Sequence, residues 1–545
     1  MMNKAYILSL TMVLTALPSM GQEGQYRLAE ATQLWRLTDN AAGLGLDSTQ
    51  NRGYALFNAE HQSGDYARVQ EGTQTNQLRF LAERYQTVGR YLHAYGRFDF
   101  DYGRTKNRAW ADVRRPYNSD PFFSGSSVRG KYDFQDFDFT AALGTVSFDG
   151  WRFGLRLDYN VGDLSRLRDP RSRSQLLDYK LTPAITYTTG AHTVGLSGNY
   201  HRRKEKITGV TTVQQDATLK YYLMTGLEHA EGTAGGYSSF SREWVDHRFG
   251  AELSYAYQAG PLHSLLSATI ERGSEDILGQ YKYEPGHYVD YCYGLNLRNR
   301  LERGTLLHEL DVQASYDQAY ADEYRQQLQQ EKNPQTGYTS FYYTTPLTFK
   351  KRYQVKQFST LLRYRLNFLT SSNSKAPHSH ASGSHSPASS SHTPASGSLC
   401  SDGVAAPSAV SAFLGATITA NDAKNRHLLP QSDLRYKGYN FTLEGGKQLL
   451  GDRLWIEAAA TYHLNSTADL TLSDPTTDYA QQVLLPDMAY YEANYWHGHL
   501  ALTYQFPLRL KGRQSLWFVR AYGDYLKTDN SLDAKCVGLS IGLFN

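Results

Sequence analysis

The clearest pattern in the chain is a pair of alternating runs that meet at a turn between residues 134 and 161. After the turn, apolar side chains occupy every second position, at Trp151, Phe153, Leu155, Leu157 and Tyr159. A period of two is typical of a β-strand, because successive side chains leave opposite faces. Before the turn the alternation slips near Gly144, which predicts a β-bulge. Asp149-Gly150 predicts a type I′ turn, since both central residues need positive φ. The stretch is therefore predicted to be a long hairpin with one apolar face and one charged face.

The same hairpin pattern recurs along the chain, and short turns alternate with long polar connections. Short turns are predicted at residues 88–90, 189–192, 260–261, 302–304, 451–452 and 511–512. This alternation is typical of an up-and-down transmembrane β-barrel, with tight periplasmic turns and longer outer loops. The predicted fold is all-β: an antiparallel barrel over residues 53–545 with about 18 strands, 14 to 20 being the alternatives, and both termini in the periplasm. A soluble sandwich or propeller is the alternative fold, since its charged faces would be solvated.

Three segments fall outside the predicted barrel strands. Residues 1–21 have a positive start, an apolar stretch and small residues, which predicts a signal peptide and an exported, outer-membrane protein. Residues 22–52 are polar and irregular, and we expect a periplasmic segment. Residues 370–408 are rich in Ser, His, Ala and Pro, which predicts a disordered insertion on the periplasmic side. Four histidines in it could bind a metal, but a variable, unstructured insertion is the preferred interpretation: His378, His380, His385 and His392.

Composition narrows the range of functions. The 56 Lys and Arg against 53 Asp and Glu leave a net charge of +3, which gives no indication of a nucleic-acid partner. Aromatic residues make up 13%, without a long internal apolar run, as expected for a barrel whose apolar residues are diluted by alternation. Three cysteines are too few for a disulfide framework or a metal cluster. No phosphate-binding, zinc or nucleophile motif is present, so no catalytic, cofactor-binding or metal-binding residue is predicted.

Charged side chains on the non-aromatic faces of the strands are expected to line the lumen. They are Arg97, Asp99, Arg152, Arg156, Asp158, Glu252, Arg298, Asp311, Arg363, Arg365, His497 and His499. Such a lining could select solutes, or the residues could pair across neighbouring strands and fill the barrel. The two histidines would also suit an outer-membrane hydrolase, which would need a serine and a polar orienter beside them, but a polar lumen filling is the simpler interpretation.

Two arginine-rich stretches are expected in the extracellular loops. Their candidate contact residues are Arg108, Trp110, Arg114, Arg115, Tyr117, Arg168, Arg171 and Arg173. They could bind anionic ligands or the phosphates of lipopolysaccharide, because guanidinium groups bind phosphate well. Ion pairing between loops is the alternative and is slightly favoured.

Three motifs carry a resemblance to a known family. They are Asn40-Ala41-Ala42-Gly43-Leu44, Trp110-Ala111-Asp112-Val113 with Pro116-Tyr117 and Pro121-Phe122, and Val161-Gly162-Asp163 with Arg168-Asp169-Pro170. These residues resemble an uncharacterised outer-membrane β-barrel family of Bacteroidota, defined as a domain of unknown function. The resemblance covers essentially the mature chain apart from the Ser/His-rich insertion. It implies a barrel in the outer membrane, in contact with its lipids, but no substrate.

The hypothesis that follows is a channel or transport pore for small solutes. The alternative is a non-conducting surface scaffold or partner-binding barrel, with an unidentified protein partner. A TonB-dependent receptor fits poorly, because only a short segment lies between Gln22 and the first strand. The last run, Val537 to Leu543, alternates and is expected to be presented to the barrel assembly machinery. Such strands commonly end in an aromatic residue, and here Phe544 is followed by Asn545.

Overall fold

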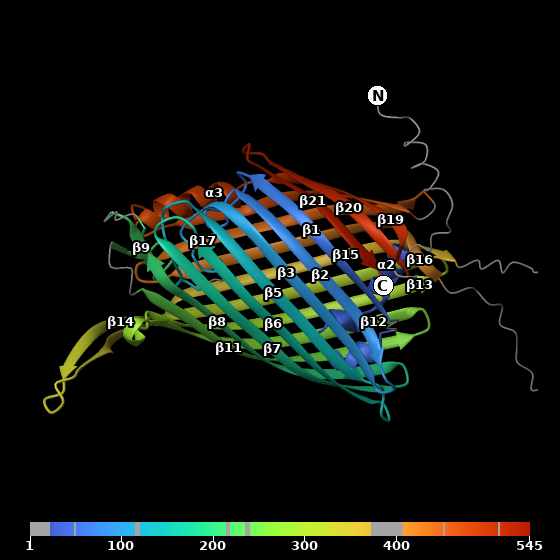
Figure 1. Cartoon of the computed structure of the whole chain (residues 1–545), viewed down its shortest axis with the longest axis horizontal. Helices are drawn as coiled ribbons and strands as arrows, with labels where there is room; N and C mark the ends of the chain where they lie inside the picture. The colour runs from blue at the N-terminus through green and yellow to red at the C-terminus, as the bar shows by residue number, and fades with distance from the viewer. Residues whose placement is uncertain are drawn as a thin grey trace, which may run out of the picture.

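The chain forms a single closed barrel (Figure 1). The computed structural model describes residues 22–47, 51–114, 120–213, 218–234, 240–371, 407–450, 453–510 and 513–544. The 18 barrel strands are β1 (Arg52–Gly64), β2 (Gln74–Val88), β3 (Leu92–Arg108), β5 (Gly130–Thr145), β6 (Trp151–Arg166), β7 (Arg171–Thr189), β8 (His192–Thr211), β11 (Ser241–Ala259), β12 (Leu262–Gly279), β13 (Gly286–Arg303), β14 (Leu306–Lys332), β15 (Thr339–Ser371), β16 (Pro407–His427), β17 (Ser432–Leu449), β18 (Leu454–Thr471), β19 (Tyr495–Leu510), β20 (Arg513–Thr528) and β21 (Asp533–Phe544).

Each barrel strand pairs antiparallel with its neighbours in the chain, and β1 also pairs with β21, from Tyr54 opposite Phe544 to Gly64 opposite Ala534. The prediction of an 18-stranded up-and-down barrel is therefore confirmed. A second, small sheet joins β4 (Ser124–Gly125), β9 (Lys220–Met224) and β10 (Ala230–Ala234). The helical elements are α2 (Gln22–Thr32), η1 (Trp35–Leu37), η2 (Ala41–Gly45), η4 (Gln280–Lys282), η5 (Ala480–Leu484) and α3 (Leu485–Tyr491). Among the described residues, no helix is both long and apolar enough to cross a bilayer.

The hairpin of β5 and β6 has the geometry that its sequence predicts. Asp149 and Gly150 have φ values of 53° and 87°, so both turn residues adopt the left-handed conformation of a type I′ turn. Gly144 pairs with Gly154, and Phe148 bridges to Trp151. Residues 145–147 lie between these two pairs on the β5 side, and only residues 152–153 lie between them on β6. The predicted bulge before the turn is therefore present.

The two ends of the barrel differ. One end, called the turn end here, carries the short connections and the ends of β1 and β21 that pair Tyr54 with Phe544. The other, the loop end, carries the long connections, α3 and the small sheet (Figure 1). β15 and β16 are joined at the turn end, where Ser371 pairs with Pro407. The predicted insertion at 370–408 has residues 372–406 outside the described part of the chain.

The apolar face of the strands points outward and forms a continuous belt. Along β6 the belt runs from Trp151 through Phe153 and Leu155 to Tyr159, each with more than 40% of its surface exposed. Aromatic side chains at both ends of an aliphatic stretch are typical of the lipid-facing surface of a membrane barrel. The charged side chains between them, such as Arg156, point inward, where Arg156 binds Asp158 (2.8 Å).

Leu155 lies in the middle of this belt, so Leu155→Arg is expected to impair folding in lipid. An arginine on the lipid face near the midplane costs about 2–4 kcal/mol. The neighbouring Arg156→Leu should cost less, because it faces the lumen and the nearby Asp39 keeps its ion pair with Lys180 (2.7 Å). Refolding titrations into lipid vesicles measure both costs. Equal losses in the free energy of folding for the two substitutions would contradict the assignment of Leu155 to the lipid-facing surface.

Candidate functional site: a lumen closed at both ends

The loops fold into the mouth of the barrel at the loop end. Their buried residues, called the loop core here, pack on inward-facing residues of β8, β11, β12, β13, β14, β15 and β17. The loop residues are Ala109, Trp110, Ala111, Val113, Phe122, Tyr221, Tyr222, Met224, Leu227, Tyr479, Val483 and Leu484, and the wall residues are Ile207, Val210, Trp244, Ile277, Tyr288, Ala319, Ala321, Tyr353, Val355 and Leu434. These wall residues come from one arc of strands, from β8 to β17. On the opposite side Tyr132 of β5 and Ser172 of β7 donate hydrogen bonds to Asp112 (2.7 and 2.6 Å), so the loops fold across this mouth.

Two of the predicted loop contact residues are buried: Trp110 belongs to the loop core, and Arg108 lies beside it. The Trp110 side chain is 1% exposed, with its ring centroid 4.4 Å from that of Tyr222 and 5.3 Å from that of Tyr479. Arg108 is 8% exposed and donates hydrogen bonds to the carbonyl oxygens of Ala111 (3.0 Å) and Val113 (2.5 Å). The prediction of exposed contacts at these two positions is wrong, because the chain turns inward after β3 and buries both side chains.

The other described arginines of the two stretches bind groups on neighbouring loops and strand ends. Arg114 pairs with Asp136, Arg171 with Asp169 (3.1 Å) and Arg173 with Asp163 (2.6 Å). Arg168 donates a hydrogen bond to the carbonyl oxygen of Arg129 (3.1 Å). Arg115 and Tyr117 lie outside the described residues. With Lys106, Arg129 and Lys131, the side chains of Arg168 and Arg171 line a surface cavity of about 610 Å³, so binding of lipopolysaccharide phosphate stays a prediction.

The turn end is closed by the N-terminal segment of residues 22–47, called the plug here. Figure 1 shows its helices inside the ring of strands. η2 approaches the wall closely: a Cβ at Gly144 would lie 2.4 Å from the carbonyl oxygen of Ala41, and one at Gly154 would lie 2.1 Å from the amide nitrogen of Ala42. Both glycines face inward, so the lack of side chains there makes room for the plug. Trp35 of η1 is buried against the inner wall.

Ion pairs and hydrogen bonds hold α2 in place. Arg27 lies 2.8 Å from Glu23 and 2.9 Å from Glu457 of β18, and its guanidinium is 4.4 Å from the ring centroid of Trp455. The hydroxyl of Tyr26 donates to Glu83 of β2 (2.7 Å). α2 thus contacts both sides of the seam between the last and first strands through polar groups.

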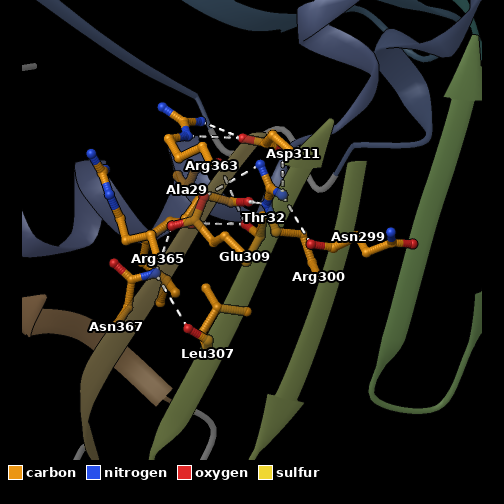
Figure 2. Close-up of polar contacts among 12 residues, drawn as sticks. Ala29, Thr32, Asn299, Arg300, Leu307, Glu309, Asp311, Arg363, Arg365 and Asn367 are labelled. Carbon is orange, nitrogen blue, oxygen red and sulfur yellow. Dashed lines mark hydrogen bonds and ion pairs between the residues drawn. The ribbon is translucent and has the colours of Figure 1, made fainter. Parts of the chain in front are cut away.

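A buried charge cluster on the wall binds the end of α2 (Figure 2). Arg300 of β13 donates from Nε to the carbonyl oxygen of Ala31 (2.7 Å), one of the helix-end acceptors that lack a partner within the helix. The same guanidinium pairs with Asp311 (2.6 Å) and Glu309 (3.3 Å) of β14. Asp311, 1% exposed, also pairs with Arg363 of β15. Three neighbouring strands therefore present one network to the plug.

The other predicted lumen residues point inward, and most pair with neighbours. Arg97 binds Asp99 (2.8 Å), Arg152 donates to Thr188 (2.8 Å), Glu252 accepts from Ser254 (3.0 Å), Arg365 binds Glu444 (2.7 Å), and Arg298 is buried. His497 and His499 both contact Asp524 (3.2 and 2.8 Å). Among the described residues no serine hydroxyl is hydrogen-bonded to either ring; the nearby Ser540 donates to Asn58 (2.8 Å).

A cavity of about 510 Å³ remains in the lumen beside the plug. Glu23, Arg27 and Glu30 of α2 line it from one side. The wall contributes both signs of charge, including Arg79, Glu457, His499, Arg520 and Asp524. Aromatic side chains complete it: Tyr26, Tyr54, Phe518, Tyr522 and Phe544. The cavity is therefore polar and mixed in charge, next to the element that closes the turn end.

Sequence comparison places the chain in one family. Residues 41–393 and 389–545 match the profile of DUF6850, described as a family of unknown function. The chain belongs to the DUF6850 family. These two matches cover both η2 and the barrel. A search of curated proteins finds no match.

Several solved structures resemble this DUF6850 barrel in fold. The outer membrane transporter YddB from Escherichia coli has a TM-score of 0.40 at 7% identity, covering 91% of this chain and 81% of its own. The copper transporter OprC has a TM-score of 0.38 at 10% identity, covering 90% and 80%. A Pseudomonas aeruginosa FadL homologue has a TM-score of 0.31 at 9% identity, covering 97% and 98%. Similarity at this level identifies no substrate for this chain.

The plug residues Tyr26 and Arg27 were not among the residues singled out from the sequence. Their segment is polar and lacks a strand period, so it was expected to lie in the periplasm outside the strands. The only local signal was the run of small residues Asn40-Ala41-Ala42-Gly43, which suits close approach to a wall. Small residues alone do not indicate which part of the protein this segment packs against.

Proposed function

We propose that this chain is an outer-membrane pore for small polar solutes whose resting state is closed at both ends. The observation that carries the proposal is the cavity of about 510 Å³ between α2 and the inner wall. Its volume is that of a small-molecule site, and its lining mixes guanidinium, carboxylate and aromatic groups. A barrel that only scaffolds other proteins has no need of such a chamber in its lumen. No catalytic role is proposed.

The plug is suited to act as the gate at the turn end. Its contacts around Arg27 are ion pairs with a partly exposed guanidinium, which water can replace. Elements that move in gating are drawn from the less stable parts of a fold. Release of α2 would join the cavity to the turn end, and release of the loop core would join it to the loop end. Conduction needs both, because the two closures lie in series.

A non-conducting surface scaffold is the second candidate. The extensive loop core favours it, because a mouth packed with apolar side chains is a stable surface for a partner. Conductance separates the two candidates.

Planar-bilayer recordings test the pore. Arg27→Glu would place a new carboxylate beside Glu23 and Glu457, and repulsion would push α2 from the wall. Replacing residues 472–494 with a short Gly/Ser linker would remove the η5–α3 part of the loop core. The wild-type protein should have a low conductance, and each change alone should raise it only slightly. The combined variant should have a conductance far above the sum of the two single increases.

The matched control is Arg104→Glu, the same charge change on an exposed side chain that binds Asp133 (2.5 Å) outside the lumen. It should leave conductance at the wild-type level. Heat-modifiable migration in gels confirms that each variant is folded. A folded combined variant without conductance above wild type would exclude the pore and leave the scaffold.

A further inference from the structure

Three side chains with metal-ligating atoms meet beside the loop core. Glu228 and His229 lie between β9 and β10, and His427 is the last residue of β16. Their ligand atoms all lie within 4.8 Å of one another, and the centroids of the two imidazole rings are 5.0 Å apart. The rings are inclined by 63°, so they do not stack face to face. About 200 residues of sequence separate His427 from the other two, which is why no local spacing motif reveals the group.

Several atoms of this group are buried without hydrogen-bond partners. His427 is 1% exposed, and neither of its ring nitrogens has a hydrogen-bond partner. Glu228 is fully buried, and its Oε2 has no partner; Nε2 of His229 has none either. Leaving buried polar atoms unpaired is costly, so natural folds rarely keep such a concentration of them. Two imidazoles and a carboxylate with their ligand atoms this close together are the donor set of a three-ligand zinc site.

Surrounding groups hold the carboxylate, and a glycine lies against the two rings. Oε1 of Glu228 accepts hydrogen bonds from the hydroxyls of Ser432 and Ser473 and from the amide of Ser473 (3.2 Å). Hydrogen bonds of this kind orient a ligating carboxylate. At Gly226 a Cβ would lie 3.1 Å from Nε2 of His427 and 3.3 Å from Cδ2 of His229, so a side chain there would crowd both rings.

The charges around the group permit a cation. Oε2 of Glu323 lies 4.0 Å from Nε2 of His427 and adds a second carboxylate close by. The neighbouring cations Arg325 and Arg352 both pair with Glu323 (2.7 and 2.6 Å), and Arg325 also pairs with Glu231 (3.7 Å), so two carboxylates face the two guanidinium groups. The His229 side chain is 32% exposed, which gives an ion a route from solvent and a water molecule access to a fourth position.

We propose that Glu228, His229 and His427 bind a zinc ion that fastens the loops at this mouth. The ion would join the β9–β10 connection to the end of β16. Through Ser432 and Ser473 it would also fix the start of β17 and the connection after β18. Zinc suits this donor set better than magnesium or calcium, which prefer oxygen ligands. The proposal is independent of conduction, because it requires only that the loops fold as described.

The experiment is a zinc titration of the full-length refolded protein by calorimetry, with bound metal counted by elemental analysis. To remove competition from the insertion, the titration uses a background in which His378, His380, His385 and His392 are replaced by Gln and Cys400 by Ser. One zinc ion per chain is expected. His427→Ala and His229→Ala should each lower the affinity by at least about 100-fold, and Ser473→Ala by about 10-fold, as for a residue that orients a ligand.

The matched control is His287→Ala, which removes an imidazole that also lies beside a carboxylate (Asp276, 2.9 Å) but, among the described residues, belongs to no group of metal-ligating side chains. It should leave zinc affinity unchanged. His229 is partly exposed, so His229→Ala keeps the test valid if His427→Ala fails to fold. A cobalt-loaded sample should show the visible absorption of a four-coordinate site. Absence of zinc in the background protein, or equal affinity in the His229→Ala and His287→Ala variants, would overturn the proposal.

Discussion

A chain that lacks residues 537–545 is expected not to form a barrel. β21 closes the sheet by pairing with β1 on one side and β20 on the other. The deletion leaves Tyr54–His61 and Leu516–Gly523 unpaired on the side that faced β21. Each unpaired backbone group in lipid costs several kcal/mol, so two open edges cannot persist in the membrane. Extracted protein should show no heat-modifiable band and should be digested by added protease.

The control for this deletion is Phe544→Ala, which keeps the backbone of β21. Phe544 was expected to serve as the terminal aromatic of an assembly strand. It points into the lumen, where its ring lies 5.0 Å from that of Phe518 and 5.7 Å from that of Tyr26 in α2. The variant should still migrate as a closed barrel. A heat-modifiable form of the deletion protein would show that another strand can close the sheet.

Asp311→Ala is expected to destabilise the protein more than other single changes in the lumen. Asp311 is buried and forms ion pairs with both Arg300 and Arg363. Arg300 in turn donates a hydrogen bond to the end of α2 (Figure 2). Removing one partner from a buried ion cluster costs about 3–5 kcal/mol. In the variant Arg300 keeps only Glu309 (3.3 Å), and Arg363 loses its ion pair with Asp311. Urea-dependent refolding in lipid vesicles measures the change in free energy of unfolding.

Asp133→Ala is the matched control, since it removes the partner of an exposed arginine, Arg104. Exposed pairs contribute little, because water solvates the charges that are left. The free energy of unfolding should therefore change little. A comparable loss in both variants would mean that the cluster at Asp311 is as hydrated as the surface pair.

The closures at the two ends differ in their chemistry. The plug contacts the wall through ion pairs and hydrogen bonds as well as small apolar clusters, whereas the loop core is one apolar and aromatic cluster. Buried carboxyl groups occur in both: burial raises the pKa of Asp47 in the plug and of Asp487 in α3 to about 7. Amides of Trp35 and Val69 donate hydrogen bonds to these carboxylates (3.1 and 2.9 Å). Because the packed states favour the protonated carboxyls, both closures should be more stable at acidic than at alkaline pH.

The alternation of apolar and polar positions by itself determined the barrel. Side chains on a strand leave alternate faces, so the pattern at Trp151–Tyr159 specifies which residues meet lipid. Asp149-Gly150 specified its turn for an equally local reason, the sign of φ at two adjacent residues. Short and long connections alternate along the chain. Counting them predicted the number of strands and the end of the barrel at which residues 370–408 are inserted.

Only the tertiary structure decided what lies inside the barrel. Trp110 and Arg108 looked like exposed loop residues, because an irregular segment has no period to show which way its side chains point. The plug, the loop core and the group of Glu228, His229 and His427 all depend on contacts between residues far apart in the chain. Such contacts are fixed by how the closed wall brings its strands together, for example where Gly144 and Gly154 leave room for Ala41 and Ala42. Local periodicity could specify the wall, whereas the filling of the lumen depends on the shape that the complete wall encloses.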